Sequence, residues 1–225
     1  MNQYYDYILD VYKECCVISL PFDCIALLKM KGYVVHSYSY LKTKNYELWE
    51  LCRKYSDDAF CIQGTNIIAY NDNAPAARIR FSLMHELGHI VLQHDNTSAV
   101  QEDEADYFAS CILAPRIIVH QLNSAKKYHL TADDIRDYFN ISITAANRVI
   151  IDYHKWYDNI AHTTRKPTDA ELKIKELFCI DKTDTKPNVA KKKTRYSKRY
   201  EEYARKSILL QQYGYEPELY SIYDD

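Results

Sequence analysis

The chain has 225 residues, of which 47% are apolar and 27% are charged, and its formal net charge is −2. This apolar content is enough to bury a core, and the near-balanced charge excludes a protein that is polycationic throughout. No basic opening segment precedes an apolar run, and no stretch approaches the roughly 18 apolar residues of a membrane span. We therefore expect a soluble, cytoplasmic protein without a membrane partner.

The N-terminal quarter of the chain predicts three helices and one strand. Residues 3–16 (QYYDYILDVYKECC) and 23–32 (DCIALLKMKG) predict the first two helices, and Gly32 suits the end of the second. The segment YVVHSYSY (33–40) is rich in the β-branched and aromatic residues that favour strands. A third helix is expected over 44–56.

Two short apolar runs, AFCIQ (59–63) and NIIAY (66–70), predict a β-hairpin. Gly64 and Thr65 stand between them, and glycine in the first of two turn positions is what a type II′ turn requires. The loop NDNAP follows, and its Pro75 suits the first turn of a helix. The hairpin would therefore lead directly into a helix.

Helices make up the next part of the chain. A long helix is expected from about 76 to 93, and another from 99 to 113, where Pro115 stops it. Residues 116–126 form one more candidate helix. In the segment 130–156, two helices separated by a turn are expected, which resembles a helix-turn-helix.

The capping residues of that last segment support the two-helix prediction. Thr131 can cap the first helix and Ser142 the second, and residues 139–141 supply the turn. The hydrophobic pattern weakens after about residue 163, and residues 164–206 hold 14 Lys and Arg against 7 Asp and Glu. Such composition favours a solvated, partly disordered extension over a contact to nucleic acid or an acidic partner.

The segment RFSLMHELGHIVLQH (80–94) lies within the long helix and places two histidines one turn apart. His85 and His89 are i and i+4, so both imidazoles can point to one ion at the roughly 2.0–2.1 Å that zinc requires. Glu86 is turned about 100° away and can accept a proton from an activated water without being a ligand. This is the division of labour in H-E-x-x-H metallopeptidases.

A catalytic zinc site needs a third protein ligand and one open position. His94 is excluded, because it lies five residues after His89 and about 140° further round a continuous helix. The next helix offers Glu102, which can close the site, and Asp106, which can accept the free N–H of a ligand histidine. Glu104 lies about 200° from Glu102 and is expected to face solvent, so it is the second choice.

Taken together, FSLMHELGHIVLQH and EDEADYFASCILAP resemble the ImmA/IrrE family of gluzincin-type metallopeptidases. The resemblance covers roughly residues 20–155 and includes the family's HElGH segment, its E-x-x-A-N/D-x-F-A segment and its closing L-x-P. Asp106 stands where the family more often has asparagine, and CILAP replaces a commoner LLMP ending. The positions that match the family's metal ligands are His85, His89 and Glu102, and the position that matches its general base is Glu86.

The resemblance implies an α+β, zincin-like fold in which a small β-sheet packs on the active-site helix. We expect a zincin-like metallopeptidase domain over 1–125, a helical, helix-turn-helix-like segment packed on it over 126–160, and a basic, tyrosine-rich C-terminal extension over 161–225. The strand at 66–70 leads into the site helix. In zincins the corresponding edge binds an extended substrate as an added strand.

The resemblance also implies a function. Family members are metal-dependent endopeptidases of the bacterial cytoplasm, so we expect a zinc metallopeptidase that cleaves a protein substrate. The expected substrate is a helix-turn-helix transcriptional repressor of a phage, a mobile element or a stress response, bound as an extended strand. Two imidazoles and one carboxylate suit zinc best, with manganese as the alternative cofactor.

Two other functions fit parts of the sequence. A DNA-binding regulatory protein with a structural or vestigial metal site would use 130–156 and the basic tail. However, Arg148 is the only basic residue of its second helix before Lys155, which is a poor match to the phosphate contacts that DNA binding needs. We therefore expect a nucleic-acid partner only if the tail supplies the contact. A structural protein that merely holds a metal would not need Glu86.

Overall fold

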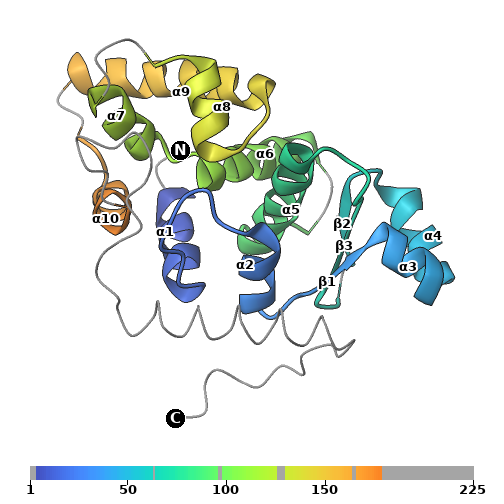
Figure 1. The fold of residues 1–225 in the computed structure, drawn as a ribbon. Coiled ribbons are helices and arrows are strands. Elements are labelled where there is room, and N and C mark those ends of the chain that lie inside the picture. Colours follow the sequence, from blue (N-terminus) through green and yellow to red (C-terminus); the bar gives the residue numbers. More distant parts are fainter. Residues whose placement is uncertain (1–3, 63, 96–97, 126–129, 164–165, 179–225) are drawn as a thin grey trace. The chain divides into compact units, whose positions relative to one another are not determined.

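The computed structural model describes part of the chain, all of it within one compact unit, Met1–Ala190. The described residues are 4–62, 64–95, 98–125, 130–163 and 166–178. Helices surround one small sheet, which confirms the predicted α+β class (Figure 1). Most of the predicted extension, 161–225, lies outside the described residues. No helix in the described part of the chain is long and apolar enough to cross a membrane.

The first two predicted helices are confirmed as α1 (Tyr4–Glu14) and α2 (Cys24–Met30). Asp23 caps α2, because its carboxylate accepts the backbone N–H of Ile25 at 2.9 Å. After α2, Gly32 has a φ of 89°, a left-handed conformation that glycine adopts without steric cost. The chain turns there and enters the sheet.

The sheet has three strands, β1 (Val34–Ser37), β2 (Ala59–Cys61) and β3 (Ile67–Tyr70), in the order β1-β3-β2. β1 runs parallel to β3, and β2 runs antiparallel to it. The NIIAY segment, β3, is therefore paired on both sides, and the expectation that it forms the substrate-binding edge is wrong. Among the described residues, the strand beside the site helix that keeps an unpaired edge is β2 (Figure 1).

The predicted strand at 33–40 is correct only in its first half. The chain leaves the sheet at Ser37, whose hydroxyl accepts the N–H of Tyr40 and begins α3 (Tyr38–Lys44). Strand composition does not reveal such a cap, which starts a helix by satisfying an N–H of its first turn. The predicted helix that follows is α4 (Tyr46–Tyr55). The two helices and β3 enclose a small buried cluster that consists of Tyr38, Leu41, Cys52 and Ala69.

The predicted hairpin forms between β2 and β3, but its turn is not of type II′. The N–H of Ile62 donates to the carbonyl of Ile67 at 3.0 Å, and the N–H of Thr65 donates to the carbonyl of Ile62 at 3.1 Å. Gly64 has a φ of 74° and occupies the third position of this four-residue turn, whereas type II′ needs glycine in the second. The glycine predicted a turn correctly but not its register.

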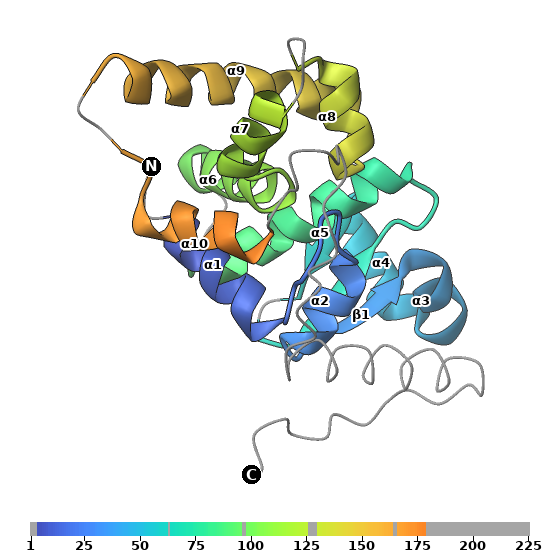
Figure 2. The same ribbon diagram turned by 60° about the vertical axis from the view of Figure 1, so that its left-hand side comes forward.

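Three predicted helices follow the hairpin and are confirmed. They are α5 (Ala76–Val91), α6 (Ala99–Leu113) and α7 (Arg116–Ala125). α5 ends two residues before the predicted end, and Pro75 precedes its first turn instead of lying within it. α5 and α6 lie side by side in both views of the fold (Figures 1 and 2).

The segment 130–156 forms two helices, α8 (Ala132–Phe139) and α9 (Ile143–Ala161). The predicted residues cap them: the hydroxyl of Thr131 accepts the N–H of Asp134, and the hydroxyl of Ser142 accepts the N–H of Ala145. Two helices joined by a short turn do not by themselves make a DNA-binding unit, because function depends on the residues that the fold presents.

A tenth helix among the described residues, α10 (Asp169–Leu177), was not predicted. Thr168 and Glu171 form a capping box at its start. α10 lies against α1 (Figure 2), and the ring of Phe178 meets the ring of Tyr12 edge to face, with centroids 5.0 Å apart. The core therefore extends beyond residue 163, where the hydrophobic pattern of the sequence had weakened.

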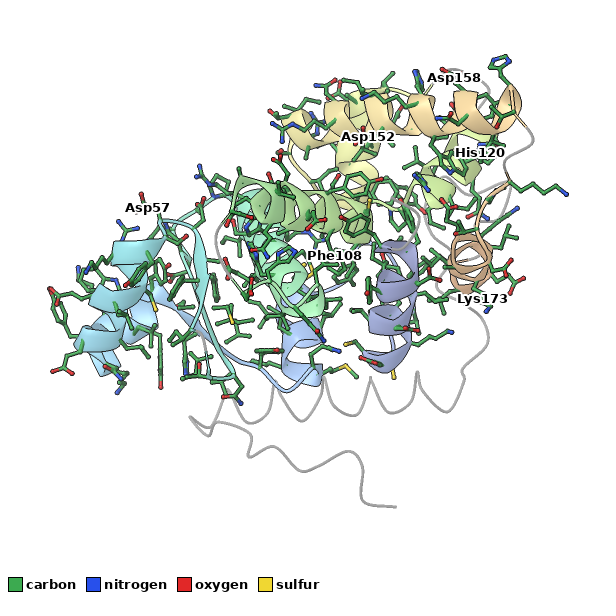
Figure 3. All side chains as sticks on the ribbon, turned by 180° about the vertical axis from the view of Figure 1, so that it is seen from behind. Asp57, Phe108, His120, Asp152, Asp158 and Lys173 are labelled. Carbon is green, nitrogen blue, oxygen red and sulfur yellow. The ribbon has the colours of Figure 1, made fainter. Side chains whose placement is uncertain are left out.

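The main core lies between α1, α2 and the helices from α5 to α10, and Phe108 of α6 projects into it with no exposed surface (Figure 3). One ion pair lies at its margin. Nε of Arg116 is 2.6 Å from a carboxylate oxygen of Glu171, whose side chain is 1% exposed. This pair joins α10 to α7.

Candidate metal centre

α5 presents two histidines toward α6, while its other face is buried in the core. The Nε2 atoms of His85 and His89 are 3.0 Å apart. Burial lowers the pKa of His89, and the neighbouring His85 lowers it further. A neutral imidazole is the form that binds a metal ion, so this environment favours ligation.

α6 brings a carboxylate to the same place. Oxygens of Glu102 lie 3.2 Å from Nε2 of His85 and 3.6 Å from Nε2 of His89. Four ligands at about 2.0–2.1 Å from a tetrahedral zinc are separated by roughly 3.3 Å. The three groups, whose ligand atoms all lie within 4.8 Å of one another, therefore fit one face of such a site.

Asp106 lies one turn after Glu102 on α6 and faces the Nδ1 side of the His85 imidazole. Its Oδ1 is 2.8 Å from Nδ1 of His85. A carboxylate there favours a proton on Nδ1, which leaves the lone pair on Nε2 toward Glu102. The position predicted for Asp106 from helical spacing agrees with this contact.

The close approach of α5 and α6 depends on Gly88. A Cβ at this position would lie 3.1 Å from Cα of Ala105 and 3.3 Å from a ring carbon of Phe108. The first of these atoms belongs to the backbone of α6, so it can yield only if the helix shifts. Because α6 also carries Glu102, the distance between the imidazoles and the carboxylate depends on the absence of a side chain at Gly88.

Replacement of Gly88 by alanine should therefore affect both folding and metal binding. Overpacking costs about 1–3 kcal/mol, and the higher helix propensity of alanine returns up to about 1 kcal/mol. We expect the metal-free Gly88→Ala protein to lose about 1 kcal/mol of stability in denaturant unfolding. We also expect weaker zinc binding in a titration, because α6 is displaced. Higher stability with unchanged zinc affinity would contradict this prediction.

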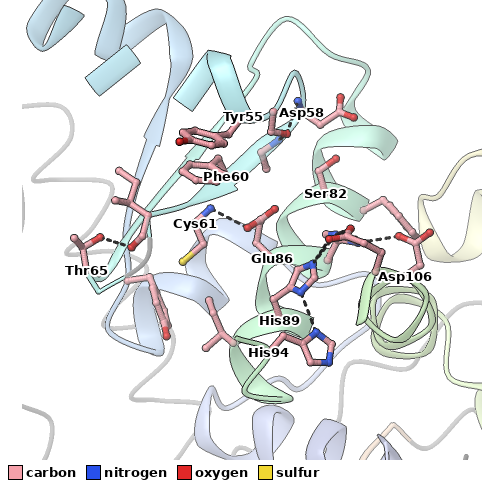
Figure 4. Close-up of a pocket in the computed structure, with 18 of the residues that line it drawn as sticks. Tyr55, Asp58, Phe60, Cys61, Thr65, Ser82, Glu86, His89, His94 and Asp106 are labelled. Atoms are coloured by element: carbon pink, nitrogen blue, oxygen red, sulfur yellow. Dashed lines mark hydrogen bonds and ion pairs between the residues drawn. The ribbon is translucent and has the colours of Figure 1, made fainter. Parts of the chain in front are cut away.

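Glu86 points away from the imidazoles toward the sheet (Figure 4). Its carboxylate accepts the backbone N–H of Cys61, at the end of β2, at 2.8 Å. Burial raises the pKa of Glu86 to about 7, although the Cys61 hydrogen bond and His85 act in the opposite direction. A carboxyl group with a pKa near neutrality is suited to accept and return a proton.

A pocket of about 740 Å³ lies between β2 and the two helices of the site. Tyr55 and Phe60 border it at one end, and His89 and His94 at the other (Figure 4). Glu86 lines the pocket between them. The predicted base and the cluster of donor atoms thus open onto the same cavity.

The model of peptidase family M78, described as the IrrE N-terminal-like domain, matches residues 40–150. The chain belongs to the ImmA/IrrE family. No curated protein matches it. The match begins within α3 and ends within α9, so it includes both helices of the metal centre. Members of this peptidase family are metallopeptidases, and the donor atoms described above are compatible with a metal ion.

In this ImmA/IrrE chain, His94, which we excluded as a third ligand on the assumption of a continuous helix, lies against His89. α5 ends at Val91, and Gln93 has a φ of 56°. The N–H of His94 donates to the carbonyl of His89, and the N–H of Gln93 donates to the carbonyl of Ile90, which is the Schellman pattern. The chain therefore reverses, and Nδ1 of His94 comes to 2.9 Å from Nδ1 of His89.

Glu104, which we expected to face solvent, has two partners in this family member. One carboxylate oxygen is 3.2 Å from Nε2 of His94, and the other accepts the hydroxyl of Tyr4 at 3.0 Å. Its contact is with the outer histidine instead of the cluster of donor atoms, so Glu102 stays the candidate ligand. The sequence offered one signal for this contact, which was a histidine just beyond the end of the site helix.

Proposed function

We propose that the chain is a zinc-dependent endopeptidase with a zincin-like fold, and that His85, His89 and Glu102 hold the ion. The observation that carries this proposal is the cluster of two imidazole nitrogens and one carboxylate beside a partly buried Glu86. The donor set supports zinc over manganese, because imidazole suits zinc whereas manganese prefers oxygen ligands. Three protein ligands leave the fourth position open toward the pocket, as a catalytic site requires.

Glu86 has the role of general base in this proposal. When bound, the ion supplies Lewis-acid activation of a water and of the scissile carbonyl. Glu86 accepts a proton from the water as the water oxygen attacks the carbonyl carbon. Glu86 then returns that proton to the amide nitrogen as the C–N bond breaks, so that a carboxylic acid and an amine leave. The same residue thus acts first as base and then as acid.

The edge of β2 supports the binding of an extended substrate. The carbonyl of Asp58 accepts the N–H of Asn71, and the N–H of Ile62 donates across to the strand β3. Because backbone groups alternate in an antiparallel pair, those of Ala59 and Cys61 point away from β3. The hydrogen bond from Cys61 to Glu86 agrees with this direction. A substrate strand would add here, with its N–H groups donating to the two outward carbonyls.

The proposed substrate is a helix-turn-helix repressor, and its cleavage would place the enzyme in the cytoplasm. This part of the proposal rests on the family resemblance. No contact among the described residues favours the alternative of a DNA-binding regulator with a vestigial metal site. In α9, Arg148 remains the only basic side chain before Lys155, and Lys155 lies 3.9 Å from Asp152.

Metal content tests the proposal directly. We expect purified protein to carry about one zinc ion per chain by elemental analysis, because the two imidazoles and the carboxylate form one site. The double variant His85→Ala, His89→Ala should lose this metal. The control variant His154→Ala, His162→Ala, which removes two exposed histidines, should keep it. Stoichiometric metal in the first variant would contradict the site.

A further inference from the structure

His94 connects the second candidate ligand to a carboxylate. Its side chain is 5% exposed, with Nδ1 at 2.9 Å from Nδ1 of His89 and Nε2 at 3.2 Å from Glu104. Glu104 in turn accepts the hydroxyl of Tyr4 at 3.0 Å. The side chains of Tyr4 (α1), Glu104 (α6), His94 (the turn after α5) and His89 (α5) thus form a continuous chain of polar contacts. Figure 4 shows the contact between His94 and His89.

The chemistry of these groups indicates which atom carries the proton in each contact. Burial and the contact with Glu104 raise the pKa of Tyr4 to about 12, so the tyrosine donates and the carboxylate accepts. The second oxygen of Glu104 lies 3.2 Å from Nε2 of His94, and its negative charge favours a proton on that nitrogen. A neutral imidazole carries one N–H, so Nδ1 of His94 has a lone pair that can only accept. The donor in the contact between the two Nδ1 atoms is therefore the Nδ1–H group of His89.

We propose that Tyr4, Glu104 and His94 are positioning residues that hold His89 in the tautomer protonated on Nδ1. Nε2 of His89 then has its lone pair, and it faces Nε2 of His85 and Glu102. Asp106 contacts Nδ1 of His85 directly. In the metal-free protein the 3.0 Å contact between the two Nε2 atoms requires a proton on one of them, which the proposal places on His85. The identity of the ion that His89 binds rests on the proposed function, but the tautomer can be tested without metal.

Nitrogen NMR of the histidines in the full-length, metal-free protein tests the tautomer. Measured above the ordinary histidine pKa of about 6.5, His89 should be protonated on Nδ1 in the wild type. His94→Leu removes the acceptor and should shift this proton toward a mixture of tautomers. His94→Asn keeps a carbonyl oxygen near the position of Nδ1 and should preserve the wild-type tautomer.

Zinc titration supplies a second readout. Loss of such an outer partner typically weakens metal binding about 10–100-fold, which we expect for His94→Leu. Glu104→Gln should have a similar effect. Its amide can donate to Nε2 of His94, which would place the His94 proton on Nδ1 against that of His89. His94→Asn should stay near the wild type. The control Asp103→Asn, an exposed carboxylate on the same helix, should have no effect.

The outcomes separate the two proposals. Wild-type protein that binds no zinc would contradict the proposed function, whereas the tautomer of His89 would still decide whether Tyr4, Glu104 and His94 are positioning residues. A His89 protonated on Nε2 in the wild type would overturn that role. So would a tautomer and a zinc affinity that are both unchanged in His94→Leu and Glu104→Gln.

Discussion

Glu86→Gln should lower peptidase activity by orders of magnitude and leave the metal in place. Glutamine preserves the shape of the side chain and can still accept the N–H of Cys61, but it cannot take a proton from water. General bases contribute about 10²–10⁴-fold to rate, so a loss of this order is expected. Single-turnover cleavage of a helix-turn-helix repressor, the proposed class of substrate, followed by mass spectrometry of the products, measures it.

The control for this experiment is Glu50→Gln, which removes an exposed carboxylate from α4 and should cleave at the wild-type rate. Zinc content should be equal in the wild type and both variants. A Glu86→Gln protein that cleaves at a near wild-type rate would show that another group moves the proton. Loss of both zinc and activity would instead assign Glu86 to the metal site.

Glu171→Ala should strongly destabilise the fold. The carboxylate of Glu171 contacts Nε of Arg116 at 2.6 Å and also accepts the backbone N–H of Thr168. Arg116 itself lies over the rings of Tyr5 and Trp156, with its side chain 13% exposed. Removal of one member of a buried ion pair costs about 3–5 kcal/mol, because the other charge stays buried without it. Urea unfolding of the metal-free protein measures the loss.

Two further variants make this prediction specific. Lys173→Ala also removes a charge from α10, but from its exposed side (Figure 3), and should change stability by less than about 0.5 kcal/mol. The double variant Arg116→Met, Glu171→Met should recover much of the loss, since it removes the charge of Arg116 together with that of Glu171. A cost near zero for Glu171→Ala would mean that α10 is not part of the core.

The helices were predictable where local signals decide them. Asp23, Thr131 and Ser142 cap helices through their own side chains, and the start of each such helix depends on residues within one turn. Spacing along α5 and α6 likewise placed His85, His89, Glu102 and Asp106 on facing sides, because each pair lies within one continuous helix.

The failures occurred where distant residues or a helix end decide the outcome. Strand order depends on pairing across the sheet, so the composition of NIIAY could not reveal that β3 is central. The position of His94 follows from the left-handed conformation of Gln93, a residue type that rarely ends helices in this way. α10 is short and mostly charged, and it is stable through its contacts with α1 and α7.

The pairing of α10 with α1 also concerns how this unit can be joined to other sequences. The first and the last described helices are neighbours, with the rings of Tyr12 and Phe178 in contact. Neither helix supplies a group to the metal cluster. We expect a fold whose first and last described helices are in contact to tolerate circular permutation.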